Sequence, residues 1–233
     1  MALIYLLSIP ILVFGYFVGR RYIQLHTITL RNTLKLASLI IALYIIALLL
    51  FVNGFLRESL AGTIMSLFYA FLSGVSIGKF HSQQDKKKAA GYPLYSYKNP
   101  VTHFTPLLVG STLIISGFLR IGWAFDFDIT PIRLFSGASL VLFGLLSFSL
   151  HITPSLRTKS ILIIDQAIDW KTFLDYHWLG EYEVQMIFEN EVDRSNNSNQ
   201  IKSVITIQVN PGERMKLERL LAIKKKARDK SNT

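Results

Sequence analysis

The chain has 233 residues, of which 51% are hydrophobic and 17% are charged, with no cysteine and a net charge of +10. The hydrophobic content excludes an intrinsically disordered protein. The lack of cysteine excludes a disulfide-stapled secreted domain and a zinc–thiolate site. A charged fraction well below about 25% is unusual for a soluble domain, so the positive charge indicates either nucleic acid or a membrane surface as a partner.

Five apolar stretches are each long enough to cross a bilayer as a helix, which takes roughly 17–25 residues. They are residues 2–19, 36–53, 60–78, 105–125 and 134–151. The first has no basic residue ahead of it and is followed by Arg20 and Arg21, which is the reverse of a signal peptide. The sequence therefore predicts a polytopic helical membrane protein with five spans, the first of them uncleaved.

The segments that connect these stretches alternate in charge. Segments 19–35 and 79–104 each carry +4, whereas 53–59 is neutral and 126–133 carries −1. Basic connections remain on the cytoplasmic side of a membrane, so we expect an outer N-terminus and an inner C-terminus, in a bacterial inner membrane. Aromatic residues are predicted near both interfaces: Trp123, Phe125 and Phe127 at the outer one, and Tyr92, Tyr95, Tyr97 and Phe104 near the inner one.

Residues 1–155 are predicted to form the transmembrane domain and residues 156–233 a small cytoplasmic α+β domain. The latter is nearly balanced in charge, since residues 157–233 hold 13 basic and 11 acidic side chains. Apolar runs and alternating apolar residues predict strands at 160–164, 184–188 and 205–209. A helix is predicted to follow, with Asn210 as its N-cap and Glu213 at its third position.

One short motif in this domain resembles a known family. An apolar residue, a tryptophan and an aromatic residue lead into Tyr-x-Trp at Ile168, Trp170, Phe173, Tyr176 and Trp178. On these positions the C-terminal tail resembles the small bacterial pleckstrin-homology-like domains of unknown function that follow membrane helices. The resemblance implies a β-rich domain at the membrane surface with no known activity. The spans themselves resemble no family.

A tetrapeptide recurs in the predicted spans. The sequence Gly-Phe-Leu-Arg occurs at 54–57 and again at 117–120, each time at the end of a helix that runs outward. The recurrence favours a 1+2+2 arrangement, in which spans 2–3 and spans 4–5 are parallel repeats. Chance similarity between helices rich in leucine and phenylalanine is the alternative, and superposition of the two hairpins distinguishes them.

Small residues occupy every fourth position of the third span, namely Gly62, Ser66, Ala70, Gly74 and Gly78. Such residues form one flat helix face, and close backbone contact across such a face drives helix association in lipid. We interpret this face as a packing face. It serves either another span of the same chain, which we favour, or a partner subunit or second copy.

A polar group is predicted at the outer side. Arg120 is the only charged residue well inside an apolar stretch, and such a charge costs at least ~2.5 kcal/mol at the bilayer centre. Pairing with Asp126, Asp128 or Glu58 near Arg57, or snorkelling, relieves that cost. No carboxylate lies in the core of any predicted span, which argues against ion-coupled transport.

Four histidines lie at or near the predicted inner ends of spans: His26, His81, His103 and His151. Neutral imidazoles can hold haem or a metal there, with His81 and His151 as the candidate ligands. No two of these histidines are four residues apart, and no thiol or carboxylate other than Asp85 accompanies them, so no metal site and no cofactor are predicted.

Two lysine clusters remain on the predicted inner side. They are Lys86, Lys87 and Lys88, and Lys224, Lys225 and Lys226. Each such residue near an anionic surface contributes about 1 kcal/mol of attraction, so the clusters predict binding of anionic lipid or an acidic partner. A role in orientation and solubility alone is the alternative. No nucleic-acid partner is predicted, because no recognised binding motif accompanies the charge.

The sequence holds no phosphate-binding glycine loop, nucleophile elbow or HExxH motif, so no catalytic residue is predicted. Asp165, Asp169 and Asp175 are interpreted as solvated turn residues rather than as an acid/base set, because no histidine or lysine base lies at a diagnostic spacing. The predicted function is a non-catalytic accessory, scaffold or assembly subunit of a larger membrane complex, with lipids, other subunits or a second copy as partners. A small transporter or channel is the first alternative. A membrane redox subunit that uses the inner histidines is the second.

Overall fold

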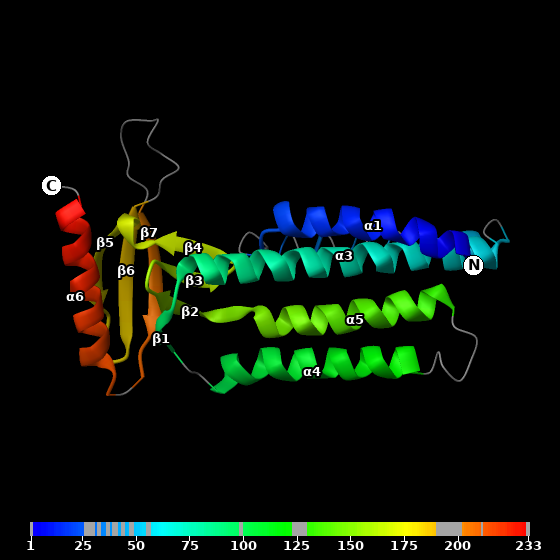
Figure 1. The fold of residues 1–233 in the computed structure, drawn as a ribbon. Helices are drawn as coiled ribbons and strands as arrows, with labels where there is room; N and C mark the ends of the chain where they lie inside the picture. Colours follow the sequence, from blue (N-terminus) through cyan, green and yellow to red (C-terminus); the bar gives the residue numbers. More distant parts are fainter. Residues whose placement is uncertain are drawn as a thin grey trace. The chain divides into compact units, whose positions relative to one another are not determined.

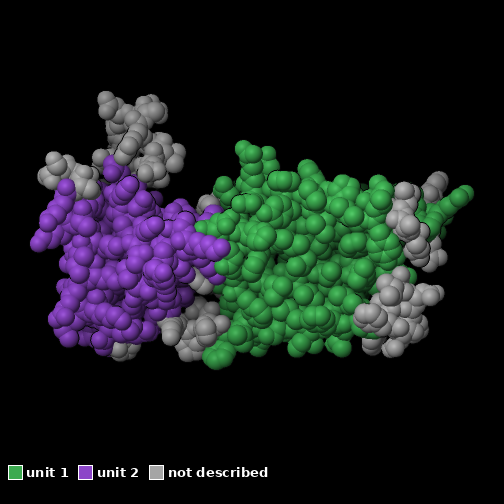
Figure 2. Space-filling view, in the orientation of Figure 1, with its two compact units in different colours: residues 1–85, 104–150 green, residues 86–103, 151–233 purple. Residues whose placement is uncertain are grey.

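The computed structural model describes six ranges, together with separate positions between 31 and 54: residues 2–25, 57–97, 100–122, 130–189, 202–210 and 212–231. The chain divides into two compact units (Figure 2). The first contains Met1–Asp85 and Phe104–Leu150, and the second contains Lys86–His103 and His151–Thr233. The second unit therefore includes a segment that lies between two predicted spans, as well as the C-terminal part of the chain.

Four long helices are described: α1 (Ala2–Arg21), α3 (Glu58–Ala90), α4 (Pro100–Gly122) and α5 (Pro131–Ser149) (Figure 1). Each is long and apolar enough to cross a membrane. Half of the second predicted span, residues 36–53, lies outside the described residues. The superposition that tests the hairpin repeat therefore also lies outside them.

Helix α3 is longer than the predicted third span and continues twelve residues beyond position 78. Residues 79–90 are mainly lysine, glutamine and alanine, which are good helix formers, so nothing in this segment stops the helix. The helix ends before Gly91, whose φ of 82° is left-handed and suits glycine.

Helices α1 and α3 pack in parallel through glycine. A Cβ atom on Gly74 or Gly78 of α3 would come within 3 Å of the backbone of α1. The reverse holds for Gly15 and Gly19 of α1, which face the carbonyl groups of Phe71 and Val75. The two backbones are therefore in direct contact along two turns, as is typical of Gly-x-x-x-Gly helix pairs in membranes.

Helices α4 and α5 form a second close pair, which is antiparallel. Gly110 and Gly117 of α4 lie against Gly144 and Gly137 of α5, respectively. The two glycines are seven residues apart in both helices, so the contacts repeat on one face of each helix. The Ser147 hydroxyl also donates a hydrogen bond of 3.0 Å to the Pro106 carbonyl.

The described residues of the second unit form seven strands and a C-terminal helix (Figure 1). The first sheet has the antiparallel order β1 (Pro93–Ser96), β2 (His151–Arg157), β3 (Ser160–Ile164) and β4 (Gln166–Asp169). The second has the antiparallel order β5 (Phe173–Trp178), β6 (Glu183–Glu189) and β7 (Lys202–Gln208). The short helix η2 (Trp170–Thr172) leads into β5, and α6 (Arg214–Ser231) follows β7.

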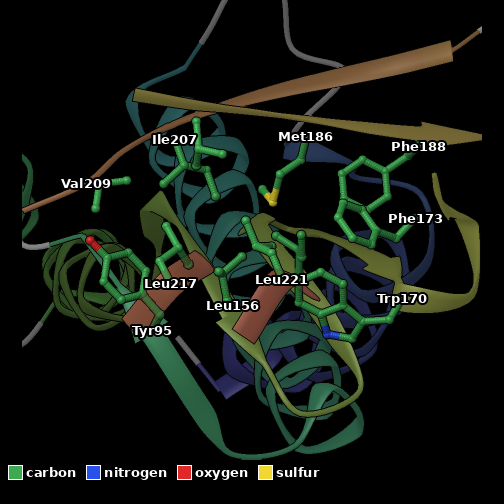
Figure 3. Close-up of a cluster of buried hydrophobic side chains, with 12 residues drawn as sticks. Tyr95, Leu156, Trp170, Phe173, Met186, Phe188, Ile207, Val209, Leu217 and Leu221 are labelled. Atoms are coloured by element: carbon green, nitrogen blue, oxygen red, sulfur yellow. The ribbon is translucent and has the colours of Figure 1, made fainter. Parts of the chain in front are cut away.

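Both sheets and α6 contribute to one hydrophobic core (Figure 3). Phe173 and Phe188 of the second sheet are 0% and 1% exposed, and Leu217 and Leu221 of α6 are both 0% exposed. Tyr95 of β1 is also buried, and its hydroxyl accepts a hydrogen bond of 3.1 Å from the Asn210 backbone N–H. The prediction that Tyr95 is an interfacial aromatic is therefore wrong.

The predicted strands at 160–164, 184–188 and 205–209 correspond to β3, β6 and β7. Two features differ from the sequence predictions. Helix α6 begins at Arg214 rather than directly after Asn210, because Gly212 has a φ of 83°, which an α-helix does not allow. His151, placed at the end of the fifth span, instead begins β2, since α5 ends at Ser149.

Candidate functional site

One member of the first lysine cluster, Lys86, makes a hydrogen bond inside the second unit. The Lys86 ammonium donates a hydrogen bond of 2.5 Å to the backbone carbonyl of Asp165. Asp165 is 0% exposed, so the prediction that it is a solvated residue is wrong. Asp165 lies in the turn between β3 and β4, next to Ile164, whose φ of 52° is strained for a β-branched residue. Lys86 therefore ties the end of α3 to this turn, whereas the Lys88 side chain is exposed.

Arg157 closes the C-terminal end of α3. Its Nη1 atom donates to the carbonyls of Gly91, at 2.8 Å, and of Lys87, at 3.2 Å. The last carbonyls of a helix have no partner within the helix and carry partial negative charge, so a guanidinium there both satisfies and stabilises them. Burial lowers the pKa of Arg157 from its ordinary value.

Two members of the second lysine cluster are also used internally. Lys224 donates a hydrogen bond of 2.5 Å to the Thr158 carbonyl and lies 5.4 Å from the centre of the Trp170 ring, and burial lowers its pKa. Lys225 forms an ion pair of 2.7 Å with Asp175, which raises the pKa of Lys225. Lys226 is exposed. The sequence predicted that all six lysines bind anionic lipid or an acidic partner. In the structure, Lys86, Lys224 and Lys225 instead contact carbonyl or carboxylate groups of the same unit.

The small-residue face of α3 lies mostly inside the first unit. Gly74 and Gly78 contact α1, while Ser66 and Ala70 are 1% and 0% exposed. Gly62 differs, since a Cβ atom there would meet nothing within 4 Å. The observed contacts agree with packing inside one chain for positions 66–78 of this face.

A cavity of about 830 Å³ lies at Gly62 within the first unit. Its walls come from α1, α3, the start of α5 and Phe51, with Ile4, Met65 and Pro131 among the apolar residues. The Thr130 hydroxyl, which also lines it, is buried and has no hydrogen-bond partner among the described residues. Thr130 is the N-cap residue of α5, yet its side chain makes no capping hydrogen bond.

The predicted outer polar group is only partly described. The Arg120 guanidinium donates a hydrogen bond to the Ser136 hydroxyl of α5, and Ser136 in turn donates to the Arg133 carbonyl at 3.2 Å. Asp126, Asp128 and the side chain of Glu58, the predicted partners of Arg120, lie outside the described residues. The Arg57 side chain is exposed.

Of the candidate histidine ligands, His81 lies in a polar contact between α1 and α3. Its Nδ1 atom is 3.2 Å from the Tyr16 hydroxyl, which also accepts a hydrogen bond of 3.0 Å from Arg20. Arg20 forms an ion pair of 3.0 Å with Asp85. The side chain of His151 is outside the described part of the structure, as are His26 and the side chain of His103. Among the residues that are described, no three His, Cys, Asp or Glu side chains are placed to hold a metal.

The sequence reasoning missed the glycines that form the helix seams. Gly15 and Gly19 of α1 have a four-residue spacing that was available as a signal. The seven-residue spacing in α4 and α5 is a weaker signal, because it appears only when both helices are compared. Lys79 was also missed: it is 2% exposed and donates a hydrogen bond of 2.6 Å to the Ile23 carbonyl.

Comparison with known proteins adds no assignment to this geometry, since the chain matches no protein family model, no curated protein and no solved structure. The chain is thus defined by its fold alone. Its described residues include four helices that are long and apolar enough to cross a membrane, together with a unit of seven strands and a C-terminal helix.

Proposed function

We propose that this protein is a non-catalytic integral membrane scaffold or assembly subunit whose spans dock against other membrane subunits. The observation that carries this proposal is the uncovered face of α4. Among the described residues, only 11% of the apolar stretch of α4 is buried, compared with 17% for α1, 28% for α3 and 33% for α5. Within the described part of the chain, helix α4 therefore makes contact along one narrow seam and leaves most of its surface uncovered.

The uncovered face lies opposite the glycine seam. Gly110 and Gly117 point toward α5, whereas large apolar residues on the other side of α4 are exposed. We define the α4 docking face by its four most regularly spaced members, Phe104, Leu108, Ile115 and Leu119, which are 59–67% exposed. Their spacing of four and seven residues places them on one side of a helix, as in helix–helix interfaces.

The second unit supports a further part of the proposal, namely a pleckstrin-homology-like module on the cytoplasmic side. Four strands in one sheet, three in the other and a C-terminal helix that enters the same core are an arrangement consistent with such a module. Trp170 and Phe173 belong to the motif that resembles this family. Their rings pack edge to face within this core, with 5.5 Å between the ring centroids. The basic connections favour this side of the membrane.

The transporter alternative requires a polar path through the first unit. The buried serines of α3 instead donate to their own helix, Ser66 to Gly62 and Ser73 to Tyr69. In α5, Ser139 donates to Ser136 in the same way. These hydroxyls are therefore already satisfied, and the structure offers this alternative no specific support among the described residues.

Cross-linking in native membranes tests the scaffold proposal. The chain has no cysteine, so Leu108→Cys and Ile115→Cys each introduce a single reactive thiol on the α4 docking face. Ile9→Cys on α1 is the matched control, since Ile9 is 65% exposed and Leu108 is 67% exposed. We expect a thiol-reactive photo-cross-linker to join the α4 positions, but not the α1 position, to a second polypeptide.

Mass spectrometry of the adducts identifies the partner, and an adduct of twice the chain mass indicates a second copy. Purification in a mild detergent provides an independent measurement, in which we expect the partner to co-elute. A monomer that gives no adduct from either α4 position would overturn the proposal.

A further inference from the structure

A groove of about 720 Å³ lies between β1 and α6 in the second unit. Its floor is apolar and includes Leu94 of β1 and Leu220 of α6. Met215 and Ile223 line the same groove and are 71% and 67% exposed, although both belong to a helix whose opposite face enters the core. The four apolar residues therefore line one groove, where Leu220 also packs against the hydrophobic core and Met215 and Ile223 are largely exposed.

The groove is positively charged. Lys216, Arg219 and Lys224 line it, and no acidic residue is among its described lining residues. Met215, Arg219 and Ile223 follow one another at intervals of four residues, so they lie on one side of α6. Lys224 is held at the edge of the groove by its hydrogen bond to the Thr158 carbonyl. The sequence clusters pointed to Lys224–Lys226, whereas the structure brings Lys216 and Arg219 together with an apolar floor.

We propose that the groove between β1 and α6 binds an acidic, amphipathic polypeptide segment of a partner protein. Its apolar side chains would lie on Leu94, Met215, Leu220 and Ile223, and its carboxylates would pair with Lys216 and Arg219. This goes beyond the scaffold proposal and does not depend on the α4 docking face, because every residue involved belongs to the second unit.

The shape of the site favours a polypeptide over an anionic bilayer. Met215 and Ile223 are separated by eight helical residues, or about 12 Å, and the apolar floor lies between a strand and a helix. A single chain segment can enter such a concave surface with two or three side chains. A bilayer surface is broad, and it would reach the exposed rim without filling the groove.

Binding of designed peptides to the full chain in phosphatidylcholine nanodiscs tests the proposal. The probe is a fluorescent amphipathic peptide of about 16 residues made of leucine and glutamate, with leucine at helical spacing. One control replaces every glutamate with lysine, and the other replaces every leucine with alanine. We expect the Leu/Glu peptide to bind at least about tenfold more tightly than either control, as fluorescence anisotropy measures.

Two variants separate charge from apolar contact. The double substitution Lys216→Glu and Arg219→Glu should weaken the Leu/Glu peptide about tenfold or more and favour the Leu/Lys peptide instead, a reversal that misfolding cannot produce. Ile223→Ser should weaken the Leu/Glu peptide with the charge unchanged. Lys88→Glu together with Lys171→Glu is the matched control, because both side chains are exposed outside the groove lining and the change in net charge is the same.

Vesicles that contain phosphatidylglycerol form the final arm of the experiment. If these vesicles capture the protein through Lys216 and Arg219 while the Leu/Glu peptide does not bind, the surface serves a bilayer and the peptide proposal is wrong. Equal binding of all three peptides, or binding that the Lys216→Glu and Arg219→Glu substitutions leave unchanged, would also overturn it. None of these outcomes depends on whether α4 cross-links to a partner.

Discussion

Each of the two units is stabilised internally by a different kind of contact. In the first, glycines bring backbones together, as Gly74 and Gly78 of α3 do against α1. In the second, large side chains such as Phe173 and Phe188 fill a core. The difference reflects the solvent: lipid tails provide no hydrophobic force between apolar helices, so close backbone approach replaces it, whereas water drives large apolar groups inward.

The comparison also explains where large hydrophobic residues lie. In the first unit, Leu108 of α4 is 67% exposed, whereas in the second unit Leu217 of α6 is 0% exposed. A leucine is therefore an outward residue in one unit and a core residue in the other. Enlarging a contact residue should destabilise the first unit, whereas truncating a contact residue should destabilise the second. These opposite expectations provide the tests of the comparison.

The largest effect is expected for Phe173→Ala in the second unit. The substitution leaves a void among both sheets and α6, and we expect a loss of about 3–5 kcal/mol in the free energy of unfolding. Hydrogen exchange of the full chain, followed by mass spectrometry, should show faster exchange in β5, β6 and α6. Leu108→Ala in α4 is the matched truncation, and because Leu108 is exposed we expect it to change little. Equal effects would contradict the comparison.

A slightly smaller effect is expected when a seam glycine is enlarged. Gly74→Leu drives a side chain into the backbone of α1, which cannot yield as a flexible side chain does, so we expect a loss of about 3 kcal/mol. The thermal midpoint in detergent measures this loss. Gly62→Leu in the same helix is the control, because a Cβ atom there meets nothing within 4 Å. Equal thermal midpoints for Gly74→Leu and Gly62→Leu would show that the glycine contact between α1 and α3 does not stabilise the protein.

Loss of a polar contact at the end of α3 should have an intermediate effect. Arg157→Gln removes the guanidinium from the Gly91 and Lys87 carbonyls, and we expect a cost of about 1–3 kcal/mol because those carbonyls lose their partner. Faster amide exchange at residues 86–91 is the readout. Lys159→Gln, on a neighbouring exposed side chain, controls for the loss of charge. Unchanged exchange in the Arg157 variant would show that the helix end does not need this cation.

The smallest effect concerns pH. The hydrogen bond from Lys225, together with the backbone N–H of Tyr176, holds the pKa of Asp175 below its ordinary value. A lowered carboxyl pKa contributes stability that is present above the ordinary pKa and is lost as pH falls through the lowered one. Because the pair is partly exposed, we expect less than about 1 kcal/mol. Thermal midpoints at neutral and acidic pH should converge for the protein and its Asp175→Asn variant as the pH falls.

The sequence predicted those elements whose pattern is local. Strands β6 and β7 show alternating apolar residues, and the helices α1, α4 and α5 are long apolar runs. It did not predict β1, because Pro93–Ser96 is only four residues long and lies between two long helices. Its pairing with β2 joins segments that are more than fifty residues apart, and no local pattern specifies such a partner.

The candidate sites divide in the same way. The sequence located the lysine clusters, but the partners of Lys86, Lys224 and Lys225 come from distant turns and strands. The groove between β1 and α6 could not be predicted at all, since one of its walls, β1, was itself not predicted. Lys216 and Arg219 appear in the sequence as ordinary surface residues of a helix.

By itself the sequence determined which segments are apolar enough for a bilayer and how their charged connections alternate, because both depend on composition along the chain. Only the tertiary structure decided which glycines bring two helices into backbone contact and which lysines bind carbonyls and carboxylates of the same chain. It also decided that β1 pairs with β2 at the edge of the first sheet. Those outcomes depend on contacts between segments far apart in sequence. A residue's own chemistry states what it can bind, whereas its neighbours in space decide what it does bind.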